Sequence, residues 1–150
     1  MRVIVENTTR VRIPPLSLRT LGVTAKRLLR LPGGSEITLV FVSDAAMRAL
    51  NRRVRGHDRS TDVLSFPLHV RRPFAADADG IVRFGDVIVS LPTARRQARK
   101  RHALFRDELR ELVVHGLLHC VGFSHDRPRG SSRMRRMAEA LLTFRAPPAS

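Results

Sequence analysis

Three histidines in the last third of the chain are spaced so that they could bind one metal ion. His115 and His119 are four residues apart, so their imidazoles would share one face of a helix. Gly122 would allow the helix to end in a left-handed turn, and His125 could then fold back towards the other two. Three neutral imidazoles hold zinc and leave a fourth position for water. The spacing predicts one Zn2+ per chain, bound by His115, His119 and His125, with His115 and His119 at the catalytic centre.

The same spacing, H-x-x-x-H-x-x-G-x-x-H, is found in the metzincin metalloproteases. Those enzymes carry a Glu directly after the first His as general base, whereas this chain has Gly116, which cannot take a proton from water. Peptide hydrolysis by that route is therefore not expected. Glu111, one turn before His115, is interpreted as an acid beside the site or on the surface, with a direct catalytic role as the lesser alternative. Cys120 could be a fourth ligand, but it lies about 100° around the helix from His119, which favours packing in the core.

A second informative stretch is rich in arginine and runs from residue 51 to residue 67, NRRVRGHDRSTDVLSFP. Its arginines crowd a predicted helix end and the loop that follows, and guanidinium groups pair well with phosphate oxygens. Gly56 would let a backbone or ligand approach closely. The stretch predicts that RNA is contacted by Arg52, Arg53, Arg55 and Arg59. The alternative is a solvated loop without a ligand.

The charge of the chain also indicates a polyanionic partner. Its 28 Lys and Arg exceed its 13 Asp and Glu, giving a net charge of +15. A GC-rich genome would explain the preference for Arg over Lys but not the shortage of acids. With no Trp or Tyr and seven Phe, no stacking platform for bases is apparent, so weak sequence discrimination and salt-sensitive RNA binding are expected. One cysteine, no membrane-length apolar run and no export signal predict a cytoplasmic protein without a membrane partner.

The elements that must position these residues follow from the hydrophobic pattern. Length and composition predict one domain, 1–150, built around a single core. We expect helices at 16–31, 44–52, 93–101, 106–121 and 132–144, and strands at 3–6, 36–42, 63–66 and within 82–90. The last two strands would be neighbours joined by a long turn-rich loop, and residues 146–150 would form a frayed tail.

Together the motifs resemble those of the YbeY family, bacterial endoribonucleases of ribosomal RNA maturation. That family has a C-terminal signature H-G-x-L-H-L-x-G-Y-D-H and an upstream segment N-x-x-x-R-G-x-D-x-x-T-D-V-L-S-F-P, with a Gly-Asp strand start between them. Here residues 115–125, residues 51–67 and Gly85-Asp86 supply these three elements, in the family's order along the chain. The resemblance covers about residues 36–125.

The resemblance implies that His115, His119 and His125 bind zinc and that Arg55 is the family's functional arginine. It implies an α+β or α/β fold, of which we expect α+β, with a small mixed sheet packed against helices and a three-His zinc site in a single domain. The implied function is a zinc-dependent, single-strand-specific endoribonuclease in ribosomal RNA processing, 16S rRNA 3′ end maturation and ribosome quality control. Its partners would be ribosomal RNA and small-subunit factors.

Two rival functions stay open on the sequence. One is a ribosome assembly factor whose zinc is structural and which binds RNA without cleaving it. The other is a metal-dependent hydrolase of another substrate, such as a peptide, which Gly116 disfavours. The general acid is also open: His57, His69 and His102 are available, and the resemblance places only His57 near the site.

The chain departs from the family pattern at several positions. Cys120, Phe123 and Ser124 replace Leu, Tyr and Asp, and Asp126 follows the last histidine instead of preceding it. A carboxylate that supports the metal ligands would therefore be shifted or lost. The family's acidic stretch after the last histidine is replaced here by an arginine-rich one. We interpret these arginines as solvated, and the alternative is that RNA contacts extend onto this helix.

Overall fold

The computed structural model describes residues 1–69, 73–124 and 128–143. Within these ranges the chain forms four strands and five helices, which alternate only in the first half of the chain, before two consecutive strands and three consecutive helices. The strands are β1 (Arg2–Asn7), β2 (Ser35–Val42), β3 (Val63–Pro67) and β4 (Val82–Ser90). The helices are α1 (Leu18–Leu28), α2 (Asp44–Arg55), α3 (Leu91–Lys100), α4 (Phe105–Cys120) and α5 (Pro128–Thr143). The tail expected at 146–150 lies outside the described residues.

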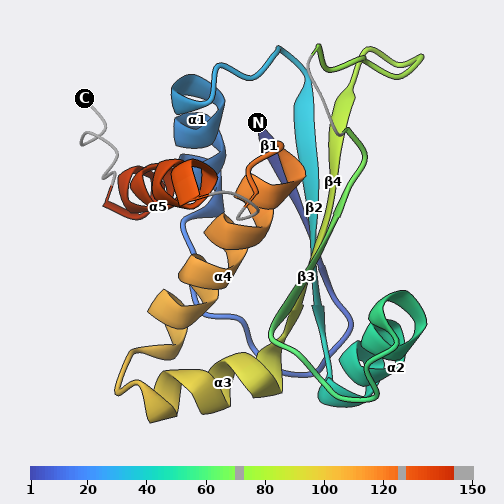
Figure 1. Cartoon of the computed structure of the whole chain (residues 1–150), viewed down its shortest axis with the longest axis vertical. Coiled ribbons are helices and arrows are strands. Elements are labelled where there is room, and N and C mark those ends of the chain that lie inside the picture. The colour runs from blue at the N-terminus through green and yellow to red at the C-terminus, as the bar shows by residue number, and fades with distance from the viewer. Residues whose placement is uncertain (70–72, 125–127, 144–150) are drawn as a thin grey trace.

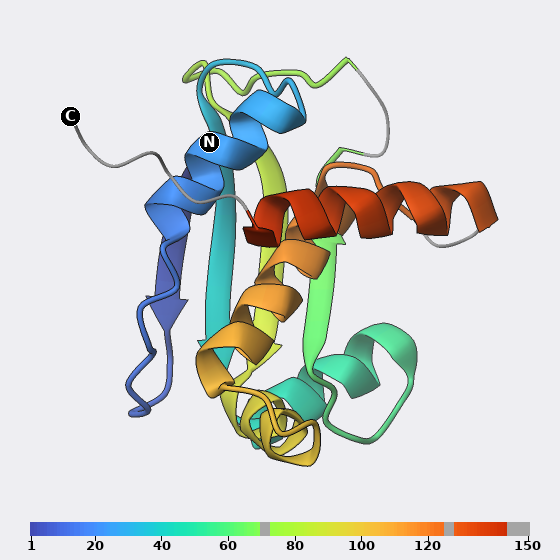
Figure 2. The same ribbon diagram turned by 90° about the vertical axis from the view of Figure 1, so that its left-hand side faces the viewer.

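The four strands form one mixed sheet in the order β1-β2-β4-β3 (Figure 1). β1 pairs with β2 and β2 with β4 in parallel, whereas β3 runs antiparallel to β4. Helices α1, α4 and α5 cover one face, as the turned view in Figure 2 makes clear, and α2 packs on the other face. The expected α+β fold with a small mixed sheet is therefore confirmed, as is the pairing of the last two strands.

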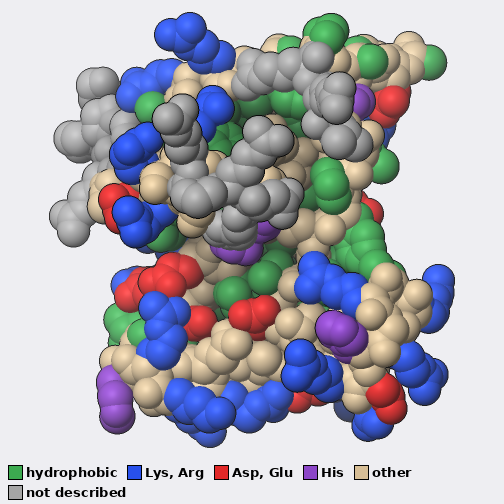
Figure 3. All heavy atoms as spheres, viewed as in Figure 1, with side chains coloured by type: hydrophobic (Ala, Val, Ile, Leu, Met, Phe, Trp, Pro, Cys, Tyr) green, Lys and Arg blue, Asp and Glu red, His purple; other side chains and the backbone are tan. Residues whose placement is uncertain are grey.

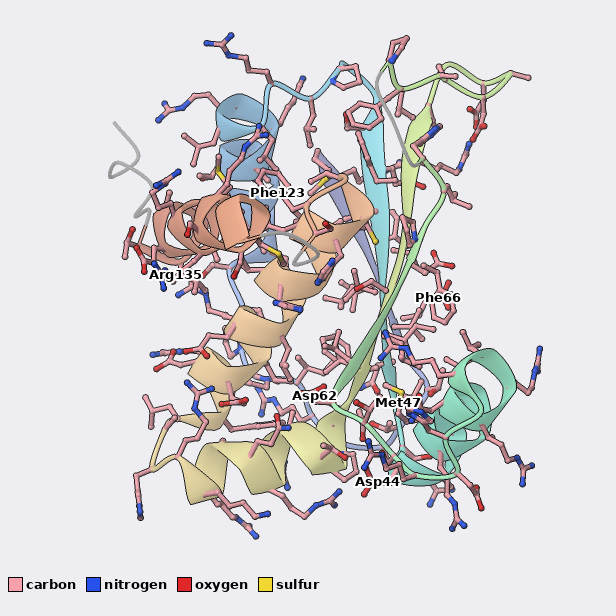
Figure 4. The ribbon with its side chains drawn as sticks, in the orientation of Figure 1. Asp44, Met47, Asp62, Phe66, Phe123 and Arg135 are labelled. Atoms are coloured by element: carbon pink, nitrogen blue, oxygen red, sulfur yellow. The ribbon has the colours of Figure 1, made fainter. Side chains whose placement is uncertain are left out.

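The main core lies between the sheet and α4. The helix residues expected to be buried are all buried, namely Leu109, Leu112, Val113, Leu117 and Cys120. A smaller cluster on the opposite face joins α2 to the sheet, with Met47, Val42 and Leu64 at its centre (Figure 4). Strand β3 therefore contributes to both faces, which matters for the site because alternate residues of a strand point to opposite sides.

The Gly-Asp element of the sequence forms a bulge in β4. Glu36 pairs with Arg83 and Thr38 with Asp86, so Phe84 and Gly85 together stand opposite the single residue between. Gly85 has φ +133, and a β-carbon there would overlap the carbonyl oxygen of Phe66. The extra residue lets both Phe84 and Val87 face the main core.

Several helix boundaries differ from the expected ones for local reasons. Helix α2 runs to Arg55 because Gly56, at φ +71, ends it in a left-handed turn. No protein atom lies within 4 Å of a β-carbon added at Gly56, so the positive φ of this residue, and not a close contact within the protein, accounts for the glycine. Helix α3 begins at Leu91 because the Ser90 hydroxyl accepts a hydrogen bond from the Thr93 N–H. No helix within the described ranges is both long and apolar enough to cross a membrane.

Candidate active site

Two of the three predicted metal ligands meet on one face of α4. The Nε2 atoms of His115 and His119 are 3.0 Å apart, and the ring centroids are separated by 4.6 Å. Both side chains are half-buried. The prediction that their imidazoles share a face is confirmed, and His125 lies outside the described residues.

The chemistry of this pair fits a zinc ion. Zinc–nitrogen bonds are about 2.0–2.1 Å long, so two imidazole nitrogens at this separation can bind the same ion. Within residues 1–69, 73–124 and 128–143, no three His, Cys, Asp or Glu side chains lie close enough together to form a metal site. The geometry suits the pair to supply two ligands, and a third protein ligand would have to come from outside the described residues.

The histidine pair lies in a cleft of about 650 Å³ between α4 and β3. Figure 3 shows histidine side chains in a hollow near the middle of this face. The walls come from the end of α2, the segment before β3, β3 itself and the turn after α4. The lining residues are Arg55, Thr61, Asp62, Val63, Ser65, Pro67, His69, His115, His119, Gly122, Phe123 and Ser124.

Arg55 is the one arginine of the 51–67 stretch that lines this cleft. It is the last residue of α2, and Gly56 turns the chain away directly after it. The other three predicted RNA-binding arginines, Arg52, Arg53 and Arg59, are exposed outside the cleft, and Arg52 lies 4.0 Å from the carboxylate of Asp58. The structure thus separates one arginine beside the histidines from three on the outer surface.

The loop after Arg55 is tied back to α2 by two contacts. Arg48 donates two hydrogen bonds of 2.9 Å to the carboxylate of Asp58. The side-chain amide of the buried Asn51 donates to the carbonyl of Arg59 at 2.9 Å. Asn51 and Asp58 of the upstream motif therefore shape the loop.

Asp44 forms the third tie and joins three parts of the chain (Figure 4). Its carboxylate accepts hydrogen bonds from Ser60, Ser90 and Thr93 at 3.0, 2.7 and 2.6 Å and pairs with Arg96 at 2.7 Å. Partial burial raises the pKa of Asp44, but hydrogen bonds from these four residues outweigh that effect and hold the pKa far below its usual value. This hub fixes the segment before β3, which forms one wall of the cleft.

Asp62, on that wall, connects β3 to α3 (Figure 4). One carboxylate oxygen accepts the N–H of Val63 at 2.7 Å, and the other accepts the side-chain amide of Gln97 at 3.1 Å. Asp62 thus fixes the start of β3 and ties it to α3.

Glu111 lies in an adjoining hollow of about 490 Å³ instead of in the cleft. It accepts a hydrogen bond of 2.9 Å from Arg101, which also bonds the buried Glu108 at 2.8 Å. Burial raises the pKa of Glu108 despite the neighbouring Arg101. Both carboxylates therefore tie α4 to the end of α3, which supports the interpretation of Glu111 as an acid beside the site.

Gly116 follows the first predicted ligand and faces the sheet. A β-carbon at this position would overlap Cγ1 of Val87 and lie 3.1 Å from the Ser65 hydroxyl. The glycine therefore brings α4 close to β3 and β4, and the helix leaves no room for the glutamate that metzincins carry here.

Cys120 is fully buried against β4, with its Sγ 3.7 Å from the carbonyl of Asp86. Burial raises the pKa of the thiol to about 12. The thiol is not among the residues that line the cleft. Core packing, the preferred interpretation of this residue, is confirmed.

Comparison with known proteins shows where this arrangement belongs. The family model described as Endoribonuclease YbeY matches residues 15–145. The chain belongs to the YbeY endoribonuclease family. The resemblance inferred from the motifs is confirmed.

Two similar curated proteins are both named Endoribonuclease YbeY. The one from Moorella thermoacetica is 46% identical over 114 residues, covering 73% of this chain and 72% of that protein. The one from Myxococcus xanthus is 42% identical over 109 residues, covering 73% of this chain but only 36% of that longer protein. A solution structure of a Thermotoga maritima protein matches with a TM-score of 0.60 at 21% identity, covering 99% of this chain and 100% of that one, and supports the fold alone.

Against the YbeY pattern, the structure adds two cleft residues that sequence reasoning missed. Phe123, which stands where the family has Tyr, lines the cleft, and the Arg133 guanidinium lies 5.1 Å from its ring centroid (Figure 4). His69 lines the cleft as well, whereas His57 and His102 are exposed and do not. Of the three histidines considered as the general acid, His69 and not His57 therefore lies in the cleft, although the segment that holds His57 reaches the cleft through Arg55 and Thr61. Alternate residues of a strand face the same side of a sheet, so extending the strand pattern from Ser65 and Pro67 by two residues would have predicted that His69 faces the cleft.

Proposed function

We propose that this chain is a zinc-dependent endoribonuclease that hydrolyses phosphodiester bonds in single-stranded RNA. The observation that carries the proposal is the meeting, in one cleft, of Arg55 with the paired imidazoles of His115 and His119. The Endoribonuclease YbeY name of the relatives supports the same reaction. By the same reasoning, the substrate is ribosomal RNA, with roles in 16S rRNA 3′ end maturation and ribosome quality control in the cytoplasm.

Zinc would be held by His115 and His119, with His125 as the third ligand. The bound ion would supply Lewis-acid activation of water or of a phosphate oxygen. The half-buried imidazoles on a helix favour such a site, because side chains on a regular element are positioned more precisely than those on a loop.

Arg55 would bind the phosphate that reacts. Its guanidinium presents paired N–H donors to the non-bridging oxygens and neutralises charge that develops on phosphorus oxygens in the transition state. The exposed Arg52, Arg53 and Arg59 would contact the backbone on either side without reading sequence. Ribosomal RNA and small-subunit factors would be the partners of this basic surface.

The rival assembly factor needs a closed metal site, because structural zinc normally has four protein ligands. Cys120 was the candidate fourth ligand, and its burial against β4 argues against that role. The rival peptidase needs a general base after His115, and the packing of Gly116 against Val87 argues against one.

The test is cleavage of structured ribosomal RNA fragments by the zinc-loaded protein, with and without chelator. His115→Ala should abolish cleavage and reduce bound zinc, and Arg55→Ala should lower the rate by roughly 100-fold to 1000-fold, the usual cost of removing a transition-state donor. Arg135→Ala is the matched control, because Arg135 lies on α5 away from the cleft (Figure 4) and should behave as wild type. If the zinc-loaded wild type binds RNA and leaves it uncut, the assembly-factor function replaces the enzyme.

A further inference from the structure

The segment from β3 onward delivers a third histidine to the cleft. Val63, Ser65 and Pro67 line the cleft, while Leu64 and Phe66 pack with Met47 on the opposite face of the sheet. This alternation continues past the end of the strand, because the N–H of Leu68 donates to the carbonyl of Phe84 at 3.0 Å. His69 is next on the cleft side and lines the cleft with His115 and His119.

Two phenylalanines hold the His69 ring in place. The centroids of Phe74 and Phe84 lie 5.8 and 6.1 Å from the imidazole centroid, at interplanar angles of 64° and 70°. These are edge-to-face contacts, and the two phenyl rings pack on each other at 4.7 Å. Phe84 is fully buried, so the imidazole is anchored to the core and not to a free loop.

The ionisable groups that share the cleft with His69 come from three other parts of the fold. They are Arg55 of α2, Asp62 ahead of β3, and His115 and His119 of α4. A guanidinium only donates hydrogen bonds, and an ionised carboxylate only accepts them. If the α4 pair is committed to a metal, His69 is the one remaining imidazole among the cleft-lining side chains of the described residues, and an imidazole can both donate and accept a proton.

We propose that His69 is a catalytic residue that protonates the leaving ribose oxygen. Water attacks phosphorus, a new P–O bond forms, and the P–O bond to the leaving ribose oxygen breaks. That oxygen takes the proton of the His69 imidazolium and departs as a hydroxyl, while the proton of the attacking water passes to solvent. His69 is left neutral and is reprotonated from solvent. The inference rests on the proposed endoribonuclease function, for which the sequence left the general acid open.

The experiment compares His69→Gln with wild type on a short RNA whose cleavage position and product end groups have been mapped with the wild-type protein. The bridging oxygen identified as the leaving atom is then replaced by sulfur, which departs as a thiolate without needing a proton. On the all-oxygen RNA, His69→Gln should lose roughly 100-fold or more in kcat with little change in KM. On the sulfur-substituted RNA, its rate should return to within about tenfold of wild type.

His102→Gln is the matched control, because His102 is exposed in the turn between α3 and α4 and should leave both rates unchanged. His69→Asn is made alongside, so that a poorly folded first variant does not end the test. An unchanged kcat, a loss confined to KM, or an equal loss on both RNAs would overturn the proposal. If the wild type itself cuts no RNA, the proposed function fails, whereas a wild type that cuts beside an equally active His69→Gln removes only the role of His69.

Discussion

Gly116 lies so close to Val87 that a β-carbon on the glycine would overlap the Cγ1 methyl of the valine. The contact joins α4 to β4 one residue after the first predicted metal ligand. Val87 faces the helix because the bulge at Gly85 restores its side chain to the main core. The position of the histidine pair over the cleft therefore depends on two glycines far apart in the sequence.

Gly116→Ala should destabilise the protein by about 1 kcal/mol. Overpacking in a filled core costs roughly 1–3 kcal/mol, and the better helix propensity of alanine returns up to about 1 kcal/mol of that. Urea unfolding of the variant measures the difference. Adding Val87→Ala should make the Gly116→Ala change nearly neutral or favourable, because the second substitution removes the overlapping methyl groups.

Gly33→Ala is the control for this pair. Gly33 is exposed, has no neighbouring atom within 4 Å of an added β-carbon, and does not adopt a positive φ. Alanine there should leave stability unchanged or raise it slightly. Equal stability losses at Gly33 and Gly116 would show that the Val87 contact is not the cause.

Cys120 should behave as a core residue in solution. Because burial raises its pKa to about 12, the thiol should resist a thiol-specific reagent in the native protein and react at once after unfolding. Cys120→Ala should keep the zinc content and the RNA cleavage rate while losing about 1 kcal/mol of stability. A fall in bound zinc, measured by native mass spectrometry, would instead mean that the thiol reaches the metal.

The parts of the site that local periodicity controls could be predicted from the sequence. The i, i+4 spacing predicted that His115 and His119 meet, and the buried stripe of α4 followed from the same period. The four arginines after residue 51 look alike in the sequence. Only the helix end at Gly56 and the packing of α2 separate Arg55 from the others.

The features that were missed depend on contacts between distant segments. Asp44 begins the helix expected at 44–52, but its partners come from residues 60, 90, 93 and 96, which no local pattern relates to it. His69 reaches the cleft because Leu68 pairs with Phe84 beyond the end of β3. Long-range pairing of this kind is set by the tertiary fold.

The three outer arginines should control the salt dependence of RNA binding. Each phosphate that is no longer neutralised reduces the magnitude of the slope of log affinity against log salt concentration by roughly 0.7 for a single strand. Replacing Arg52, Arg53 and Arg59 by Ala should therefore reduce that magnitude by about 2. Binding of a labelled single-stranded RNA between low and moderate salt gives the slope. The rate of cleavage at saturating RNA should change little, because these side chains lie outside the cleft.

A control for net charge replaces three other exposed arginines, Arg10 and Arg12 between β1 and α1 and Arg19 in the first turn of α1. This variant removes positive charge far from the arginines at the end of α2 and should leave the slope nearly unchanged. Equal effects of the two sets on the slope would mean that RNA senses only the overall charge of the protein, and the predicted contacts would be wrong.

The Asp44 hub should make stability fall in acid. Hydrogen bonds from Ser60, Ser90, Thr93 and Arg96 hold the pKa of Asp44 below its value in the unfolded chain, about 3.9. A lowered pKa stabilises the folded state at pH values above the pKa of the unfolded chain, and this contribution is lost as the pH falls from about 4 towards the folded pKa.

Asp44→Asn should therefore lower the free energy of unfolding by about 1 kcal/mol at pH 7, and progressively less below pH 4. The figure is modest because the side chain is 34% exposed. Glu139→Gln on α5 is the control, because it makes the same change in net charge at an exposed position. Urea unfolding of both variants across pH measures the part of the free energy of unfolding that comes from the Asp44 hydrogen bonds. A cost for Asp44→Asn that stayed constant down to pH 2 would contradict the predicted role of these bonds.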